Sequence, residues 1–142
     1  EHVLNAEKFD VSHSQNALSI SKGSLSIPLG EYDRALSILN SVSNNGWAMW
    51  RRGILKLMSN DLSGAKSEMA SLRKLFADNG WDENGYIDYA NAVISAREGN
   101  TGSITSNLRS ALEKDQTGDL KERLINDVEF LNYSDAVNAA MN

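Results

Sequence analysis

The 142-residue chain contains no cysteine, one proline and two histidines. The missing thiols exclude disulfide bonds and thiolate metal sites. His2 and His13 are too few and too close to one end for a convincing metal site. No stretch approaches the roughly 20 apolar residues that span a bilayer. We therefore expect no metal, no cofactor and no membrane span.

Basic residues are also scarce, since the formal net charge is −5. Residues 1–60 carry a charge of +1 and residues 61–142 carry −6. The conspicuous basic pair, Arg51 and Arg52, lies among apolar residues. Proteins that bind nucleic acid usually concentrate positive charge on one face to neutralise phosphates, so the sequence predicts no nucleic-acid partner.

Motifs of known enzyme classes are incomplete. Ser-x-x-Lys occurs at Ser19 and Ser71, but the partner motifs of the serine β-lactamases are missing. There is no Gly-x-Ser-x-Gly elbow, and the carboxylates are scattered rather than paired. The sequence thus favours a protein that is not an enzyme.

Residues 82–88 imitate the middle of a calcium-binding EF-hand loop, with oxygen ligands at alternate residues and a glycine for the bend. In that register the first ligand position falls on Gly80 and the bidentate glutamate position on Asn91. Both ends of the ligand set are lost. A polar loop entering a helix, with Asp82 or Asn84 as N-cap, is the better interpretation.

What the chain does have is apolar residues at helical spacing, interrupted by glycine and asparagine turns. We expect a tight turn at Ser59–Asp61, a helix end at Gly99 followed by a turn at Asn100–Gly102, a capping box at Asp119 and Glu122, and an N-cap at Ser134. The expected helices cover about 14–27, 31–42, 47–58, 62–76, 84–98, 103–115, 119–131 and 134–140.

Small residues recur at fixed intervals in these helices. Gly53 and Ala65 are separated by twelve positions, as are Gly23 and Ala35. Counting from Ala35 to Ala65 and on to Ile104 gives steps of 30 and 39 residues. One step is shorter and the other longer than a known repeat length of about 34 residues.

The pattern resembles a degenerate tetratricopeptide-repeat (TPR) array. The first repeat carries the Gly-x-Tyr-x-x-Ala turn, whereas the third has Ala92 and Ile104 at positions where the family has glycine and alanine. The resemblance implies one domain over 1–142, an all-α right-handed superhelix of about three hairpins. The hairpins cover about 14–43, 46–78 and 84–115, followed by capping helices over 119–140.

Residues 85–133 are more narrowly similar to the TPR tails of OmpA-like cell-envelope proteins of Gram-negative gut bacteria. The similar segments are YANAVISAREGN, ITSNLRSALEKD and LKERLINDVEFLNY. This likeness implies a periplasmic or cell-envelope location. It also implies that the chain is part of a larger envelope protein. Composition alone fits the cytoplasm equally.

The predicted function is a non-catalytic scaffold that binds a protein or peptide partner on a curved helical surface. Aromatic and basic residues of the first helices are the expected contacts, because they make good peptide anchors. The alternatives are that the aromatic residues are core, that the chain is a structural spacer of a larger envelope protein, or that it is a carbohydrate-associated module. The candidate contact residues are Trp47, Trp50, Arg51, Ile54, Tyr86, Tyr89 and Arg97.

Overall fold

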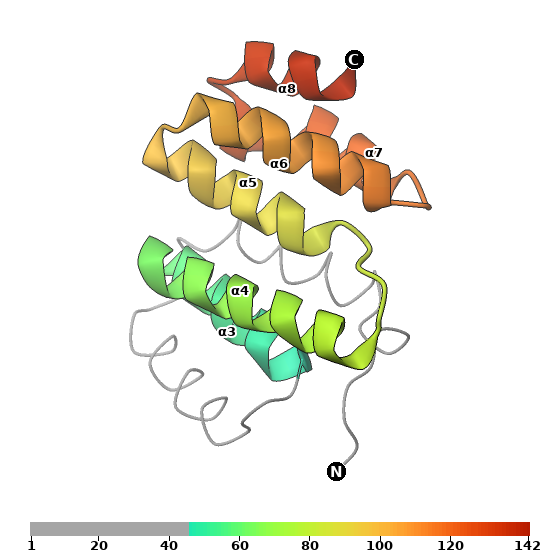
Figure 1. Ribbon diagram of the computed structural model, residues 1–142. Coiled ribbons are helices and arrows are strands. Elements are labelled where there is room, and N and C mark those ends of the chain that lie inside the picture. Colours follow the sequence, from blue (N-terminus) through green and yellow to red (C-terminus); the bar gives the residue numbers. More distant parts are fainter. Residues whose placement is uncertain (1–45) are drawn as a thin grey trace. The chain divides into compact units, whose positions relative to one another are not determined.

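The computed structural model describes residues 46–142, and these residues are helical with no strand among them (Figure 1). The prediction of an all-α protein is therefore confirmed for this range, while the superhelix stays a prediction. The predicted hairpin 14–43, with Gly23 and Ala35, lies outside the described residues. The helices are α3 (Gly46–Met58), α4 (Leu62–Asn79), α5 (Tyr86–Glu98), α6 (Thr101–Lys114), α7 (Asp119–Ile125), the 3₁₀ helix η2 (Val128–Phe130) and α8 (Ser134–Met141).

The chain divides into two compact units between Asp82 and Glu83. Unit 1 includes α3 and α4, and unit 2 contains α5 to α8. No helix in the described range has the length and apolar character needed to cross a membrane. The single repeat domain over 1–142 stays a prediction.

In unit 1, α3 and α4 form an antiparallel hairpin (Figure 1). Trp50, Ile54 and Leu57 line the buried face of α3, and α4 presents a matching stripe at intervals of four, three and four residues. A methyl group added at Gly53 would overlap Met69 Cε and lie 3.3 Å from Glu68 Cβ. Gly53 therefore sits where the two helices approach closely, as expected of a small residue at a helix crossing.

Three helices end in the same way, with one residue in the left-handed region. These residues are Asn60, Gly80 and Gly99, with φ of 65°, 68° and 75°. The amide that follows each one bonds to the carbonyl five residues earlier, as in a Schellman motif. The predicted turn at Ser59–Asp61 and the predicted helix end at Gly99 are confirmed, whereas the turn expected at Asn100–Gly102 is shorter, because Asn100 caps α6 and this helix begins at Thr101. Each hairpin therefore reverses within a few residues.

Unit 2 begins with a second antiparallel hairpin, α5 against α6. Asn100 caps α6 by accepting a hydrogen bond from the Ser103 amide at 3.2 Å. The buried face of α6 consists of Ile104, Leu108 and Ala111, at intervals of four and three. Ile104 is fully buried, so this hairpin accommodates a large side chain where the family resemblance expects an alanine.

The C-terminal region differs from the expectation of one helix over 119–131. The helix α7 ends at Ile125, and Asp127 then caps η2 by accepting from the Glu129 amide at 3.0 Å. An aspartate side chain that bonds to nearby backbone amides competes with helix continuation. The expected single helix is thus wrong, because it breaks at Asn126-Asp127.

Two capping predictions also fail. Asp119 is the first residue of α7 rather than its N-cap, which is Gly118 with φ 82°. The carboxylate that organises this start belongs to Asp115, which accepts from the Thr117 and Leu120 amides at 3.0 and 2.8 Å. The N-cap of α8 is Tyr133, without a side-chain cap bond, rather than Ser134.

Candidate functional site

Unit 2 has a surface groove of about 460 Å³ that is lined in part by exposed apolar side chains. Its walls are the end of α7, the turn through η2, and one face of α8. Ile125, Val128 and Leu131 contribute to it while being 65%, 64% and 75% exposed. We call this surface the C-terminal groove. A cluster of large exposed apolar side chains is uncommon on a surface with no partner.

The helix α8 has two faces with different roles. Ala136 and Ala140 are buried, and α8 lies against α6. Thr105 Oγ1 and Arg109 Nη2, both on α6, donate to the carbonyls of Ala136 and Ala139 at 3.2 and 2.8 Å.

The other face of α8 opens to the groove. Ser134, Val137, Asn138 and Met141 line it at intervals of three, one and three, which places them on one side of a helix. Val137 and Met141 are half-buried. Methionine is flexible and polarisable, so Met141 can adapt to the shape of an incoming apolar group.

The floor of the groove is fixed by a buried polar contact. Tyr89 on α5 donates its hydroxyl to Asp127 Oδ2 at 2.6 Å, and both residues are buried. The ring of Phe130 meets the Tyr89 ring edge to face, with centroids 5.7 Å apart. Burial, then the charge of Asp127 and the hydrogen bond to it, raises the pKa of the Tyr89 hydroxyl well above its ordinary value. Tyr89 therefore stays a proton donor.

Two further contacts attach the groove wall to α5. Arg97 donates Nε and Nη2 to the two carboxylate oxygens of Glu129 at 3.1 and 2.6 Å, which is the bidentate geometry of a strong pair. Tyr133 donates its hydroxyl to the Ala96 carbonyl at 3.0 Å. Residues on both sides of η2 are thus tied to one helix, so the exposed apolar side chains stand on a fixed backbone.

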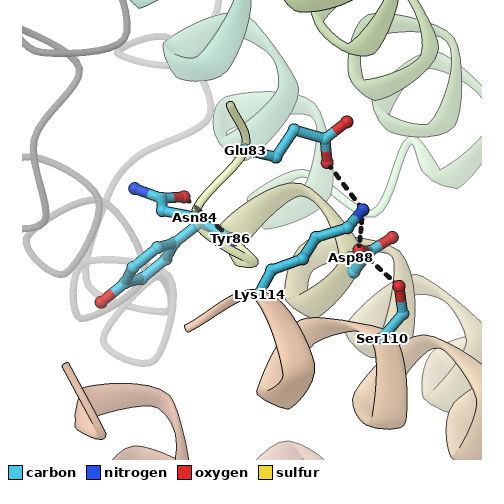
Figure 2. Close-up of polar contacts among 6 residues, drawn as sticks. All are labelled: Glu83, Asn84, Tyr86, Asp88, Ser110 and Lys114. Carbon is cyan, nitrogen blue, oxygen red and sulfur yellow. Dashed lines mark hydrogen bonds and ion pairs between the residues drawn. The ribbon is translucent and has the colours of Figure 1, made fainter. Parts of the chain in front are cut away.

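A polar cluster lies at the other end of α5 (Figure 2). The Lys114 ammonium lies 2.8 Å from Asp88 Oδ2 and 3.2 Å from Glu83 Oε1, and Ser110 donates to Asp88 at 2.9 Å. Asn84 accepts from the Tyr86 amide at the helix start. Asp88 is only 2% exposed.

The electrostatics of this cluster indicate a structural role. Burial favours the neutral amine of Lys114, but the hydrogen bonds and charges of Asp88 and Glu83 outweigh it, and the pKa of Lys114 is raised. A general base or an amine nucleophile needs the neutral form at working pH. Lys114 is therefore best understood as the ion-pair partner that makes a buried Asp88 tolerable.

The calcium-like segment 82–88 belongs partly to this cluster. The described residues hold no group of three or more carboxylates and histidines placed to bind a metal ion. The N-cap of α5 is Gly85, with φ 94°, rather than Asp82 or Asn84. A methyl group at Gly85 would overlap the Ala111 carbonyl oxygen, so a close approach of α5 to α6 explains this glycine.

The candidate contact residues chosen from the sequence fall in two sets, with Trp47, Trp50, Arg51 and Ile54 on α3 in unit 1 and the others on α5 in unit 2. Most are core rather than open surface, because their side chains are at most 2% exposed. The buried ones are Trp50, Ile54, Tyr86 and Tyr89.

Three candidates remain partly exposed. The Arg51 guanidinium lies 5.1 Å from the centroid of the Trp47 ring, in cation–π geometry. Arg97 forms an ion pair with Glu129. A contact role for these three stays a prediction.

The C-terminal groove was missed for a specific reason. On one continuous helix over 119–131, Val128 and Leu131 extend the buried stripe of Leu120 and Leu124. Only Leu120 and Leu124 are buried. The signal that could have revealed the break is Asn126-Asp127, since both residue types favour turns and caps.

No protein-family model, no curated protein and no solved structure matches this chain. The interpretation of its function therefore rests on its own residues.

Proposed function

We propose that this protein is a non-catalytic binding module whose C-terminal groove docks a protein or peptide partner. The observation that supports this most directly is the exposure of Ile125, Val128 and Leu131 beside a groove of about 460 Å³. Large apolar side chains gain free energy when a partner removes them from water, at about 25 cal/mol per Å². Keeping them exposed on an otherwise well-packed unit is costly for solubility unless they are used.

The rigidity of the groove supports the same proposal. Its floor and wall are held by the Tyr89–Asp127 and Arg97–Glu129 contacts, so a partner does not have to order the backbone on binding. Preorganisation of this kind improves affinity by reducing the entropy lost in the complex. The candidate surface moves from the first helices, where most aromatic residues are buried, to the end of unit 2.

The family and location remain part of the proposal. A TPR-like array is supported by the α3–α4 hairpin, in which Gly53 sits at the close approach. A cell-envelope location, with the chain as part of a larger envelope protein, rests on the similarity of residues 85–133 alone.

A structural spacer is the second candidate. It is favoured by the burial of Trp50, Tyr86 and Tyr89, which removes the aromatic anchors expected on a binding face. A spacer predicts that the exposed apolar residues of unit 2 can be replaced without loss of any interaction.

Selection from a displayed peptide library on the full chain tests the proposal. The counter-target is a triple variant, Ile125→Ser, Val128→Ser and Leu131→Ser, in which the groove becomes polar. All three side chains are exposed, so we expect each substitution to change the free energy of unfolding by no more than about 0.5 kcal/mol, and the triple variant to stay within about 1.5 kcal/mol of the parent. Peptides that enrich on the parent and not on the variant support groove binding. Equal enrichment on both targets, or none on either, would contradict it and favour the spacer.

A further inference from the structure

We infer that the partner of the C-terminal groove is an amphipathic α-helix with a basic flank. This inference rests on the proposed function and specifies the partner's chemistry. Its three supports are the secondary structure of the groove walls, the spacing of the exposed apolar residues, and the charge around them.

The walls of the groove, like the rest of the described residues, contain no strand edge for recognition by strand addition. They consist of α7, η2, α8 and the turns between them. An extended peptide would find no strand with which to pair its amides and carbonyls, and each such group that it buried unpaired would cost about 1–3 kcal/mol. A helix satisfies its backbone internally and presents only side chains, as in helix-in-groove complexes.

The exposed apolar residues offer a surface suited to such a helix. Ile125 stands at the end of α7, Val128 begins η2 and Leu131 follows it, while Val137 and Met141 lie on the facing side of α8. Apolar groups on two walls accept a stripe of residues at intervals of three and four from one helix.

The charge around the groove points to a basic flank. From Leu124 to Asn142 the chain has no lysine or arginine, while it has Asp127, Glu129 and Asp135. Arg97 offsets Glu129, and the charged side chains of α7, two acidic and two basic, balance. Asp127 is buried and bonded to Tyr89, and Arg109 of α6 lies against α8, so Asp135 is the exposed carboxylate of this segment. Unit 2 as a whole carries ten acidic against five basic side chains. This excess attracts a basic partner and disfavours a second copy of the same face, because like charges would then meet.

Fluorescence anisotropy with three labelled peptides on the full chain tests the inference. The first is an 18-residue Leu/Lys amphipathic helix, the second has each Lys replaced by Glu, and the third is a scrambled Leu/Lys sequence of the same composition. We expect the amphipathic Leu/Lys helix to bind about tenfold more tightly than either of the others at low salt. We expect its binding to be lost with the triple serine variant of the groove.

A matched pair of charge variants tests the location of the attraction. Asp135→Asn removes an exposed carboxylate of α8 that is next in sequence to the groove residue Ser134, and Asp82→Asn removes an exposed carboxylate that precedes α5 and does not line the groove. We expect the first to weaken binding of the Leu/Lys helix about two- to threefold and the second to leave it unchanged. Equal losses would show diffuse attraction and overturn the inference.

The remaining outcomes separate this inference from the proposed function. Equal affinity for the Leu/Lys and Leu/Glu helices, with both lost in the triple variant, would overturn the basic partner while leaving groove binding intact. No binding by any helix, together with groove-dependent peptides from the library, would overturn the helical partner only. A concentration-dependent dimer in sedimentation, abolished by the triple variant, would replace it with a second copy of this chain.

Discussion

In both described hairpins, a residue in the left-handed region is followed by an Asx N-cap: Asn60 and Asp61 between α3 and α4, Gly99 and Asn100 between α5 and α6. Asp61 and Asn100 each accept from an amide three residues later, at 3.0 and 3.2 Å. The reversal of the chain is thus local and is built twice by the same chemistry.

The interiors of the two units differ. In unit 1 the close approach at Gly53 is to the flexible end of Met69, and Glu68 is shared between Arg52 at 3.2 Å and Lys56 at 2.8 Å. In unit 2 the close approach at Gly85 is to a backbone carbonyl. Unit 2 also buries the carboxylates of Asp88 and Asp127.

Similar turns can therefore connect helices whose packing tolerates amino-acid substitutions to different degrees. A side-chain contact can be relieved by a new rotamer, whereas a backbone contact or a buried charge cannot. The following substitutions test this difference, either between the two units or between a buried charge and a neutral group within unit 2.

The largest difference is expected for the two glycines. Gly85→Ala forces a positive φ on alanine and an overlap with the Ala111 carbonyl, with Leu120 Cδ1 only 2.9 Å away. We expect a loss of about 3 kcal/mol in the free energy of unfolding. Gly53→Ala should change it by less than about 1 kcal/mol, because the gain in helix propensity offsets the rearrangement of Met69.

Urea denaturation followed by far-UV circular dichroism measures both. All three tryptophans lie between residues 47 and 81, so tryptophan fluorescence reports on unit 1 separately. Gly99→Ala is the control, because its φ is also positive but nothing lies within 4 Å of the added methyl group. A loss there as large as that for Gly85→Ala would contradict the role of the backbone contact.

A smaller effect is expected from Tyr89→Phe, which removes the hydroxyl bonded to the buried Asp127. We expect a loss of about 2 kcal/mol at pH 7, because a buried carboxylate loses a partner. Tyr133→Phe removes a bond to a neutral carbonyl and should cost less, about 1 kcal/mol. Chemical denaturation of the two variants gives both values, and equal losses would contradict the importance of the buried charge.

The effect of Tyr89→Phe on the free energy of unfolding should depend on pH. Since the folded-state pKa of Tyr89 is raised above its ordinary value of 10.0, the protein releases this proton more easily when unfolded. The stabilisation is complete below pH 10 and is lost as the pH rises above it. The stability advantage of the parent over Tyr89→Phe should therefore be constant from pH 7 to 9 and narrow by pH 11.

The smallest effect on stability is expected for substitutions of two lysines that form ion pairs, one in each unit. Lys114→Gln removes a cation from the buried Asp88, and we expect a loss of about 1–2 kcal/mol after allowing for the partial exposure of Lys114. Lys74 pairs with Asp78 in unit 1, but their side chains are 76% and 59% exposed. Lys74→Gln should therefore change stability by less than about 0.5 kcal/mol. Thermal unfolding distinguishes the two, and equal shifts would contradict the burial argument.

Local features of the fold could be predicted well from the sequence. The turns at Ser59–Asp61 and Gly99 depend on residues that accept positive φ or cap helices, and these signals lie within a few positions. The stripe of Leu62, Ala65 and Met69 likewise indicates a helix without knowledge of its partner.

The candidate site was less predictable. The spacing of Trp50 or Tyr89 fits a binding face and a core face equally well, because periodicity identifies a stripe without saying what covers it. Val128 and Leu131 fit a buried stripe only if the helix continues past Ile125. Their exposure depends on Asp127, which accepts from both Tyr89 and the Glu129 amide.

The helical class, the two described hairpins and their turns follow from local sequence, since hydrogen bonding and apolar spacing act over a few residues. Which apolar side chains are buried, and which remain in the C-terminal groove, depends on the tertiary structure. It also determined that Asp88 and Asp127 are buried with partners 26 and 38 residues away. Burial is a property of neighbours distant in the chain, and no local pattern specifies them.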